Sequence, residues 1–212
     1  RLKQEGDCLY RRGHWWSGVL MMHTGLRAGD CAQLLPSDFL LDDEIPHLII
    51  QPGTLPEGIA KRSKFGARTH TVPLLPILFD LGLREFVEAR AKRKPKARLF
   101  DEISLGANRM SAGMTKFWQP YLEAFDLFKP GRATHVFRHT VANRLRDHAF
   151  SHNEDIGAVL GHTKANAETN TTESYGGPQG LKRKLDTLSK LDFGFDVLEA
   201  LGGKYNLKRH RY

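Results

Sequence analysis

The sequence predicts a mainly helical α+β domain with a small three-stranded antiparallel sheet. Three observations predict it: several segments carry apolar residues at helical spacing, three short β-favouring stretches lie between residues 46 and 74, and 40% of the 212 residues are hydrophobic. A chain of this length forms one large domain or two small ones and can bury a sizeable core. We divide it into a principal domain, residues 1–190, and a C-terminal tail, residues 191–212.

The first half of the chain contains two predicted helices and then the predicted sheet. Residues 14–23 have helical apolar spacing, and Gly25 breaks that helix. A second helix is predicted from Ala28 to Leu35, stopping before Pro36. The predicted strands are residues 46–52, 58–64 and 68–74, the last two around Gly66.

The second half of the chain is predicted to be helical. An apolar face that includes Phe79 and Val87 marks one helix, and further helices are predicted at residues 108–126, 134–148, 152–160 and 181–190. The expected core side of the helix at 108–126 is Phe117, Trp118, Tyr121, Leu122 and Phe125. The tail is apolar and amphipathic from Leu191 to Leu201, which suits packing on its own domain. Docking on a neighbouring protomer is the alternative, which only a family resemblance of the chain implies.

Charge and cysteine content narrow the class of protein. The net charge of +8 suits a polyanionic partner such as nucleic acid, although charge alone does not establish one. Cys8 and Cys31 have neither zinc-type spacing nor a disulfide framework, which indicates an intracellular, reduced protein, and Cys31 fits a small core residue. No membrane-spanning stretch or signal peptide is visible, and the start at Arg1 suggests a fragment.

A basic run from Arg90 to Arg98 has two interpretations. We slightly favour a solvated helix end, where cations are stabilised near the helix C-terminus. The alternative is a patch that contacts phosphates, in which Lys92 and Arg93 would bind DNA.

Two arginines far apart in the sequence, Arg27 and Arg138, are candidates for gripping a phosphate. A guanidinium stays charged and can hold two phosphate oxygens at once, and donors aimed at the non-bridging oxygens stabilise the transition state of phosphodiester cleavage. Alternatively, each arginine pairs with a carboxylate such as Asp30, which follows Arg27 by three positions. Both interpretations hold if the carboxylate orients the arginine.

The helix predicted at residues 134–148 presents His135 and Arg138, three positions apart, on a different face from its apolar stripe. That spacing places a potential general base, His135, beside a potential phosphate-binding residue, Arg138. His135 and His139 also have the four-residue spacing of a helical zinc pair. Val136 stands, however, where a metalloprotease helix has glutamate, and no third ligand is evident, so we favour a supporting role for His139.

Several ordered sequence blocks carry a family resemblance. Residues 24–30 read TGLRAGD, residues 71–74 read TVPL, residues 134–140 read THVFRHT and residues 159–162 read VLGH. In order and context these blocks closely resemble the catalytic domain of tyrosine recombinases, the phage-integrase family, from about Trp15 to Tyr175. The resemblance implies an integrase-like tyrosine recombinase fold, with the catalytic domain over residues 1–190. The catalytic residues that it implies are Arg27, Lys64, His135, Arg138, His162 and Tyr175.

The resemblance gives each of these residues a role. Tyr175 would be the nucleophile, and because a tyrosine has a pKa of about 10, it needs help from His135 to lose its proton. His162 would donate a hydrogen bond to a non-bridging oxygen. Lys64, on the hairpin that enters the minor groove, would protonate the leaving 5′ oxygen, with Lys61 as its competitor. Asp30 and His139 are the expected supporting residues, and the expected DNA contacts are Arg62, Arg68, Lys92 and Arg93.

The resemblance also implies a reaction and its partners. DNA would be cut and rejoined through a covalent 3′-phosphotyrosine, giving integration or excision without a metal, ATP or other cofactor. The partner would be double-stranded DNA, on which the protein forms a homotetramer, with weak or no self-association without DNA. The expected location is the cytoplasm, at the nucleoid, for a protein encoded by a bacterium, phage or mobile element.

The sequence departs from the family in ways that keep alternatives open. Tyr175 follows His162 by 13 positions, about one helical turn more than in many relatives, and Asp30 stands where many relatives have glutamate. The family's N-terminal core-binding domain is not in this sequence, so weak DNA binding is expected. A catalytically silent DNA-binding module remains an alternative because of the longer interval. A type IB topoisomerase is another, opposed by His135, since those enzymes usually carry lysine there.

Overall fold

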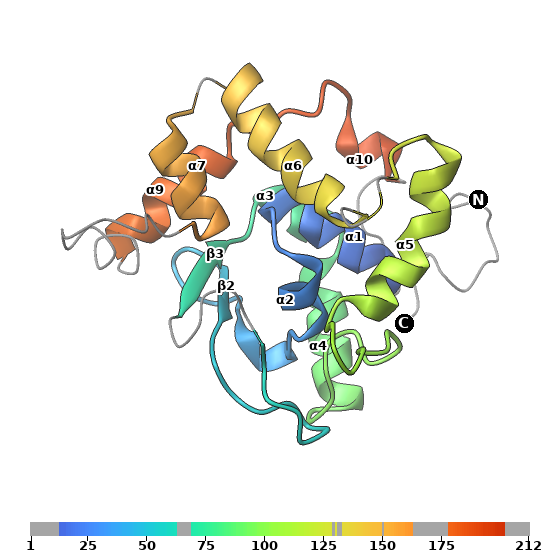
Figure 1. Ribbon diagram of the computed structural model, residues 1–212. Coiled ribbons are helices and arrows are strands. Elements are labelled where there is room, and N and C mark those ends of the chain that lie inside the picture. Colours follow the sequence, from blue (N-terminus) through green and yellow to red (C-terminus); the bar gives the residue numbers. More distant parts are fainter. Residues whose placement is uncertain are drawn as a thin grey trace, which may run out of the picture.

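Helices make up most of the fold, and a small antiparallel sheet lies beside them (Figure 1). The computed structural model describes residues 13–62, 69–128, 130, 133–149, 151–162 and 178–201. For these residues the prediction of a mainly helical domain with a three-stranded antiparallel sheet is confirmed. None of the helices in these segments has both the length and the apolar character needed to span a membrane.

The elements run in the following order along the chain. They are α1 (Gly13–Thr24), α2 (Ala28–Ala32), the 3₁₀ helix η1 (Pro36–Asp38), β1 (Phe39–Leu40), β2 (His47–Ile50), β3 (His70–Pro73), α3 (Pro76–Asp80), α4 (Leu83–Arg93), α5 (Ala112–Ala124), α6 (His135–Asn143), the π-helical turn η2 (Arg144–His148), α7 (Asn153–Leu160), α9 (Pro178–Leu188) and α10 (Val197–Ala200).

Helix α1 lies at the centre of the core. It is buried on nearly every side, as expected for a helix that is apolar all round, and α2, α5 and α6 pack against it. Trp16 of α1 stacks on Phe86 of α4 with ring centroids 5.4 Å apart. Trp118 of α5 donates to the Ser17 hydroxyl at 3.2 Å, so the large aromatic rings fix the positions of the helices around α1.

The sheet has β2 in its middle, paired antiparallel to β1 on one side and β3 on the other. Leu48 of β2 lies opposite Phe39 and Val72, and all three side chains are buried. The predicted strands at residues 46–52 and 68–74 are therefore confirmed as β2 and β3. Helix α9 packs against β3 and α7, which joins the sheet to the last part of the helical domain.

The strand predicted at residues 58–64 is wrong for its described part. Residues 58–62 form a turn and an extended loop, whose one described ladder contact is an isolated bridge between Thr54 and Ala60. Gly58 donates to the carbonyl of Leu55, which closes a tight turn instead of extending a strand. The third strand is β1, and its two residues are too few to give an alternating pattern in the sequence.

Two helices begin or end at residues other than those predicted from the sequence. Helix α2 stops at Ala32 rather than Leu35, because Leu35 is extended before Pro36, where a following proline disfavours helical backbone. Helix α5 starts at Ala112 and ends at Ala124. Phe125 therefore lies past the helix and is 74% exposed, so its assignment to the core is wrong.

The described part of the tail, up to residue 201, lies against the helical domain. Phe193 and Val197 are buried, and the Phe193 ring meets the ring of His23 edge-on at 5.5 Å. The prediction that Cys31 is a core residue is confirmed, because its side chain is fully buried and burial raises the pKa of its thiol.

Candidate functional site

Three segments that are distant in the sequence meet at one place: the turn between α1 and α2, helix α6, and the end of α7. Gly25 ends α1 with φ +67°, a left-handed conformation that favours glycine. A Cβ at this position would collide with the Leu160 side chain and touch that of Val141. A glycine at this turn therefore lets the segment that carries Arg27 approach both α6 and α7.

Arg138 projects from α6 into this junction and is 8% exposed. Its guanidinium donates to the carbonyl oxygen of Gly25 at 2.8 Å and to that of Leu160 at 2.7 Å. Burial, and then the charge of Arg27, lower the pKa of Arg138 to about 10, while Asp30 raises it. The group stays charged at neutral pH, and the two bonds use two of its five N–H donors.

Arg27 lies at the start of α2, next to Arg138. Its guanidinium is 3.8 Å from the Asp30 carboxylate, and the two side chains are 21% and 3% exposed. The contact predicted from their spacing is therefore present. Asp30 is almost completely buried, and its negative charge raises the pKa of Arg138, which offsets part of the repulsion from Arg27.

His162 follows the end of α7, where Gly161 adopts φ +67° and turns the chain out of the helix. The His162 backbone N–H donates to the Gly157 carbonyl at 2.7 Å, which fixes this turn. Burial, then Arg138, then Arg27 lower the pKa of His162. The imidazole is therefore neutral at pH 7 and has one N–H to donate.

The other two histidines of the proposed set lie on the surface of α6. His135 begins the helix and is exposed, one turn before the buried Arg138. His139 is also exposed, and its ring centroid is 6.3 Å from that of His135. The structure thus brings Arg27, Asp30 and Arg138 together with His162, whose side chain is exposed. His135 and His139 are also exposed, on the surface of α6.

The remaining predicted catalytic residues cannot be placed in the same way. Lys64 and Tyr175 lie outside the described residues, as does Arg68, an expected DNA contact. Lys61, the competitor of Lys64, is described: its ammonium is 2.8 Å from the Asp38 carboxylate, with the two side chains 10% and 3% exposed. A lysine held in such a pair is not available to a substrate without breaking it.

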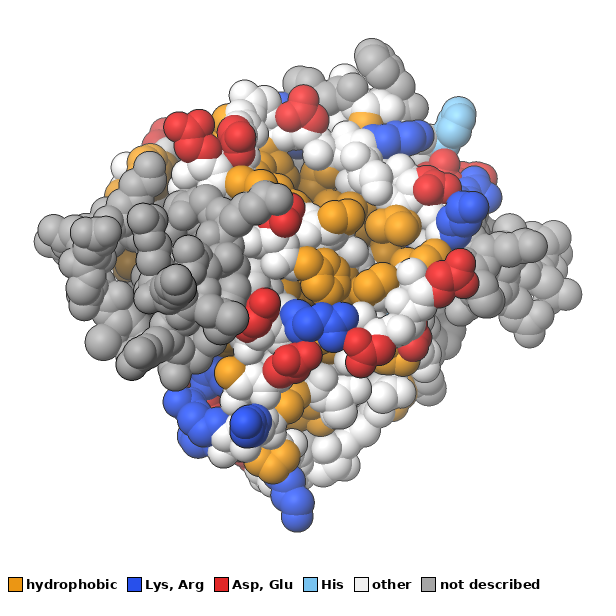
Figure 2. Space-filling view, turned by 180° about the vertical axis from the view of Figure 1, so that it is seen from behind, with side chains coloured by type: hydrophobic (Ala, Val, Ile, Leu, Met, Phe, Trp, Pro, Cys, Tyr) orange, Lys and Arg blue, Asp and Glu red, His pale blue; other side chains and the backbone are white. Residues whose placement is uncertain are grey.

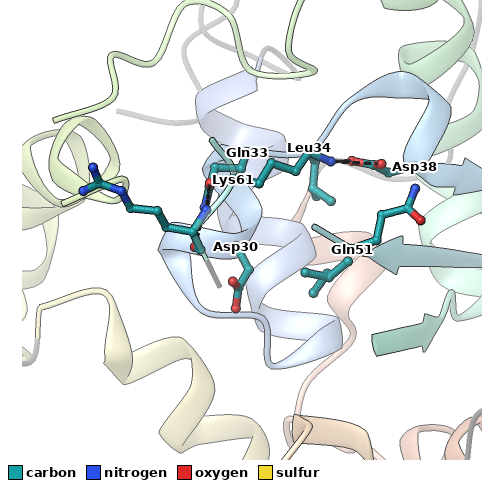
Figure 3. Close-up of a pocket in the computed structure, with 8 residues that line it drawn as sticks. Asp30, Gln33, Leu34, Asp38, Gln51 and Lys61 are labelled. Atoms are coloured by element: carbon teal, nitrogen blue, oxygen red, sulfur yellow. Dashed lines mark hydrogen bonds and ion pairs between the residues drawn. The ribbon is translucent and has the colours of Figure 1, made fainter. Parts of the chain in front are cut away.

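Gln33 connects α2 to the chain before residue 63. Its side-chain amide accepts a hydrogen bond from the Arg62 backbone N–H at 2.6 Å and donates one to the Arg62 carbonyl at 2.9 Å. This pair of bonds resembles the pairing of two residues in a β-sheet. It also donates to the Gly29 carbonyl at 2.6 Å. These contacts lie beside a small hollow lined by Asp30, Gln33, Leu34, Asp38, Ile50, Gln51, Lys61 and Arg62 (Figure 3).

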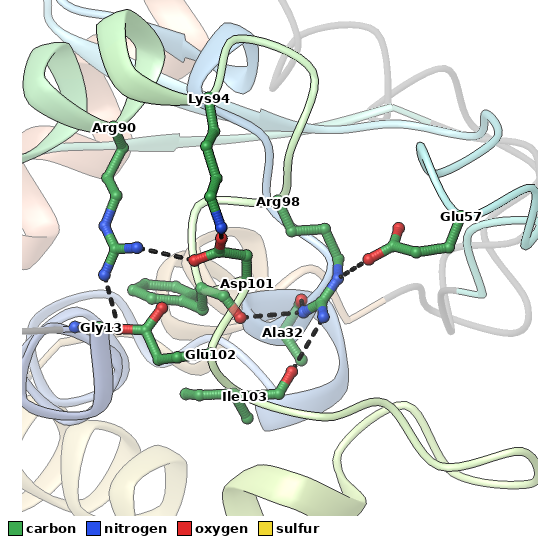
Figure 4. Close-up of polar contacts among 10 residues, drawn as sticks. Gly13, Ala32, Glu57, Arg90, Lys94, Arg98, Asp101, Glu102 and Ile103 are labelled. Atoms are coloured by element: carbon green, nitrogen blue, oxygen red, sulfur yellow. Dashed lines mark hydrogen bonds and ion pairs between the residues drawn. The ribbon is translucent and has the colours of Figure 1, made fainter.

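The basic run at the end of α4 is partly structural (Figure 4). Arg90 and Lys94 both bond to Asp101, at 2.7 and 2.6 Å. Arg98 is 5% exposed and donates to Glu57 and to three backbone carbonyls, so it joins α2 to two loops. Lys92 and Arg93 are exposed, as is Arg62. The end of α4 lies well away from α7 in Figure 1.

Two buried residues beside the junction were missed in the sequence. His70 of β3 is 7% exposed, and its Nε2 is 3.1 Å from the Val159 carbonyl. Lys184 of α9 is 3% exposed and donates to the Thr71 carbonyl at 2.9 Å. The sequence did contain a signal for His70: it lies two positions before the apolar Val72, and residues two apart in a strand point to the same face. For Lys184 no local pattern distinguishes it from its exposed neighbours.

Comparison of the chain with protein-family models, with curated proteins and with solved structures gives no match.

Proposed function

We propose that this chain is the catalytic domain of a tyrosine recombinase with the integrase-like fold, which cuts and rejoins DNA through a covalent phosphotyrosine. One observation carries the proposal. The Arg138 guanidinium bridges the carbonyls of Gly25 and Leu160, each two positions before another residue of the predicted set. Arg27, Arg138 and His162 thereby converge from three segments, which is the arrangement needed to surround one phosphate with donors.

The charges at this site fit an anion rather than a cation. Burial and then the charge of Arg27 lower the pKa of Arg138, so the two guanidinium groups repel one another, while burial and both arginines keep the His162 imidazole neutral. A phosphate placed between them would relieve that repulsion and accept hydrogen bonds from both arginines. Stabilisation of the transition state by such a donor is worth on the order of 3 kcal/mol.

In the proposed reaction the Tyr175 hydroxyl attacks the phosphorus of one DNA strand. A Tyr–O–P bond forms and the bond from phosphorus to the 5′ oxygen breaks. His135 takes the tyrosine proton, Lys64 gives a proton to the departing 5′ oxygen, and His162 donates to a non-bridging oxygen. A 5′ hydroxyl then attacks the phosphotyrosine and restores the DNA backbone, so bond energy is conserved and no ATP is consumed.

The general acid is assigned to Lys64 rather than Lys61, because Lys61 is held by the buried carboxylate of Asp38. The net charge of +8 and the exposed side chains of Arg62, Lys92 and Arg93 support a DNA partner. The face seen in Figure 2 mixes acidic, basic and apolar side chains, which does not favour it as the DNA-binding surface. We propose double-stranded DNA held between protomers of a tetramer.

Covalent trapping tests the proposal. The protein is incubated in EDTA with nicked duplexes taken from the DNA that flanks its own gene and is then run on a denaturing gel. We expect a protease-sensitive DNA adduct that is lost in Tyr175→Phe. Tyr121→Phe is the matched control, since Tyr121 is a half-buried aromatic of α5 packed on Phe117 and Trp118, and it should keep the adduct.

Two results would contradict the proposal. One is an adduct that survives in Tyr175→Phe. The other is a native chain that binds the duplex but forms no adduct, which would indicate a DNA-binding module without catalysis. Rejoining only of the original strand, with no transfer to a partner strand, would instead identify a topoisomerase.

A further inference from the structure

The end of helix α7 is held by four hydrogen bonds to its last four carbonyl groups. A helix leaves these groups without partners inside the helix. Here His162 N–H bonds to the Gly157 carbonyl and Gly161 N–H to the Ala158 carbonyl. The last two carbonyls, of Val159 and Leu160, are each within hydrogen-bond distance of a side chain from elsewhere in the fold.

Those two side chains are His70 and Arg138. Arg138 Nη2 is 2.7 Å from the Leu160 oxygen, and His70 Nε2 is 3.1 Å from the Val159 oxygen. A carbonyl oxygen can only accept, so His70 Nε2 carries the proton in this contact. Beyond the two bonds of its own turn, the segment that presents His162 is therefore fixed by one residue of α6 and one of β3.

The surroundings keep His70 neutral and in place. Burial, then the charge of Lys184, lower the pKa of His70 to about 3, with smaller contributions from Arg138 and Arg27 in the same direction and an opposing one from the Val159 contact. Lys184 holds the next residue of β3 by donating to the Thr71 carbonyl at 2.9 Å and to its hydroxyl at 3.3 Å. Arg183 of α9 is paired with Asp155 of α7 at 2.6 Å. Helix α9 therefore bonds to β3 through Lys184 and to α7 through Arg183.

We propose that His70 is a positioning residue, which caps the Val159 carbonyl and so holds His162 beside Arg27 and Arg138. It acts through the α7 turn and does not touch the phosphate. The inference builds on the proposed function, because it concerns the same site, but its first test needs neither DNA nor catalysis.

That test is an NMR titration of ¹³C-labelled histidine side chains, with the His162 signal identified by its loss in His162→Gln. In the native protein burial, and then the charges of Arg138 and Arg27, lower the pKa of His162. His70→Leu removes the N–H donor, so the turn should loosen and the pKa of His162 should rise measurably towards the ordinary 6.5. His70→Gln keeps an N–H at a similar reach and should preserve the native value.

A second buried strand histidine offers the matched control. His47 of β2 is 8% exposed and contacts the Ile45 carbonyl at 2.9 Å through Nδ1. His47→Leu removes a buried histidine from the same sheet without removing any contact to α7. It should therefore leave the pKa of His162 unchanged. If His70→Leu does not fold, His70→Asn replaces it, because the shorter amide falls short of the Val159 oxygen.

Catalysis gives a second readout. In the covalent trapping assay, His70→Leu should slow adduct formation on the order of 10²-fold at saturating DNA while DNA affinity stays constant, and His70→Gln should restore most of the rate. An unchanged His162 pKa in a folded His70→Leu or His70→Asn protein overturns the positioning role. If His162 responds as expected but the native chain forms no adduct, the positioning role stands and the recombinase proposal fails.

Discussion

The Arg138 guanidinium donates a hydrogen bond of 2.8 Å to the carbonyl oxygen of Gly25, which lies 113 positions earlier in the chain. The same guanidinium holds the Leu160 carbonyl at 2.7 Å. A residue that we propose binds phosphate therefore also joins α6 to the turn after α1 and to the end of α7. Stability and activity should consequently fall together when this side chain is changed.

Arg138→Lys tests that link. One ammonium group cannot reach both carbonyls with the geometry of a guanidinium, so at least one buried acceptor loses its partner. We expect the free energy of unfolding in urea to fall by about 1–3 kcal/mol and adduct formation to slow by about 10²–10³-fold. Arg146→Lys is the control, since Arg146 is an exposed arginine with contacts of 3.3 and 3.4 Å to two asparagines. Equal stability of the two variants would argue against the bridging role.

Lys184 should give the stability of the protein a distinctive pH dependence. Burial lowers its pKa to about 8 from the ordinary 10.5, so between these values the unfolded chain binds more protons than the folded one. Stability should therefore rise with pH across this window, by on the order of 2–3 kcal/mol. Urea unfolding of native protein and Lys184→Met at pH 7 to 10.5 measures it. A difference between the two proteins that stays constant with pH would show that Lys184 titrates normally.

Gln33→Leu should release the chain at Arg62. The substitution removes both hydrogen bonds to the Arg62 backbone, of 2.6 and 2.9 Å, so the Arg62 amide should exchange with solvent at least tenfold faster, corresponding to a loss of about 1.4 kcal/mol. Hydrogen exchange followed by NMR measures this amide directly. Gln119→Leu serves for comparison, because Gln119 is a surface glutamine of α5 that bonds to Glu123, and it should leave Arg62 unaffected. Unchanged protection in Gln33→Leu would mean that other contacts hold this segment.

Local sequence patterns were enough to predict much of the fold. Apolar spacing located α1, and short β-favouring stretches located β2 and β3, because helix and strand periodicities are properties of neighbouring residues. The strand predicted at residues 58–64 failed because Gly58 and the residues around it form a turn. Phe125 was placed in the core because its spacing continues that of α5, yet the helix ends one residue earlier.

At the site, local sequence was enough to identify the candidate side chains and the contacts between close neighbours. The contact between Arg27 and Asp30 followed from a spacing of three positions, since one helical turn brings such residues together. Three features depend on tertiary packing: the burial of Arg138 between Gly25 and Leu160, the ion pair between Asp38 and Lys61, and the bonds of His70 to Val159 and of Lys184 to Thr71. These contacts join residues 22 to 113 positions apart, and the packing of whole elements, rather than any local pattern, brings them within hydrogen-bond distance.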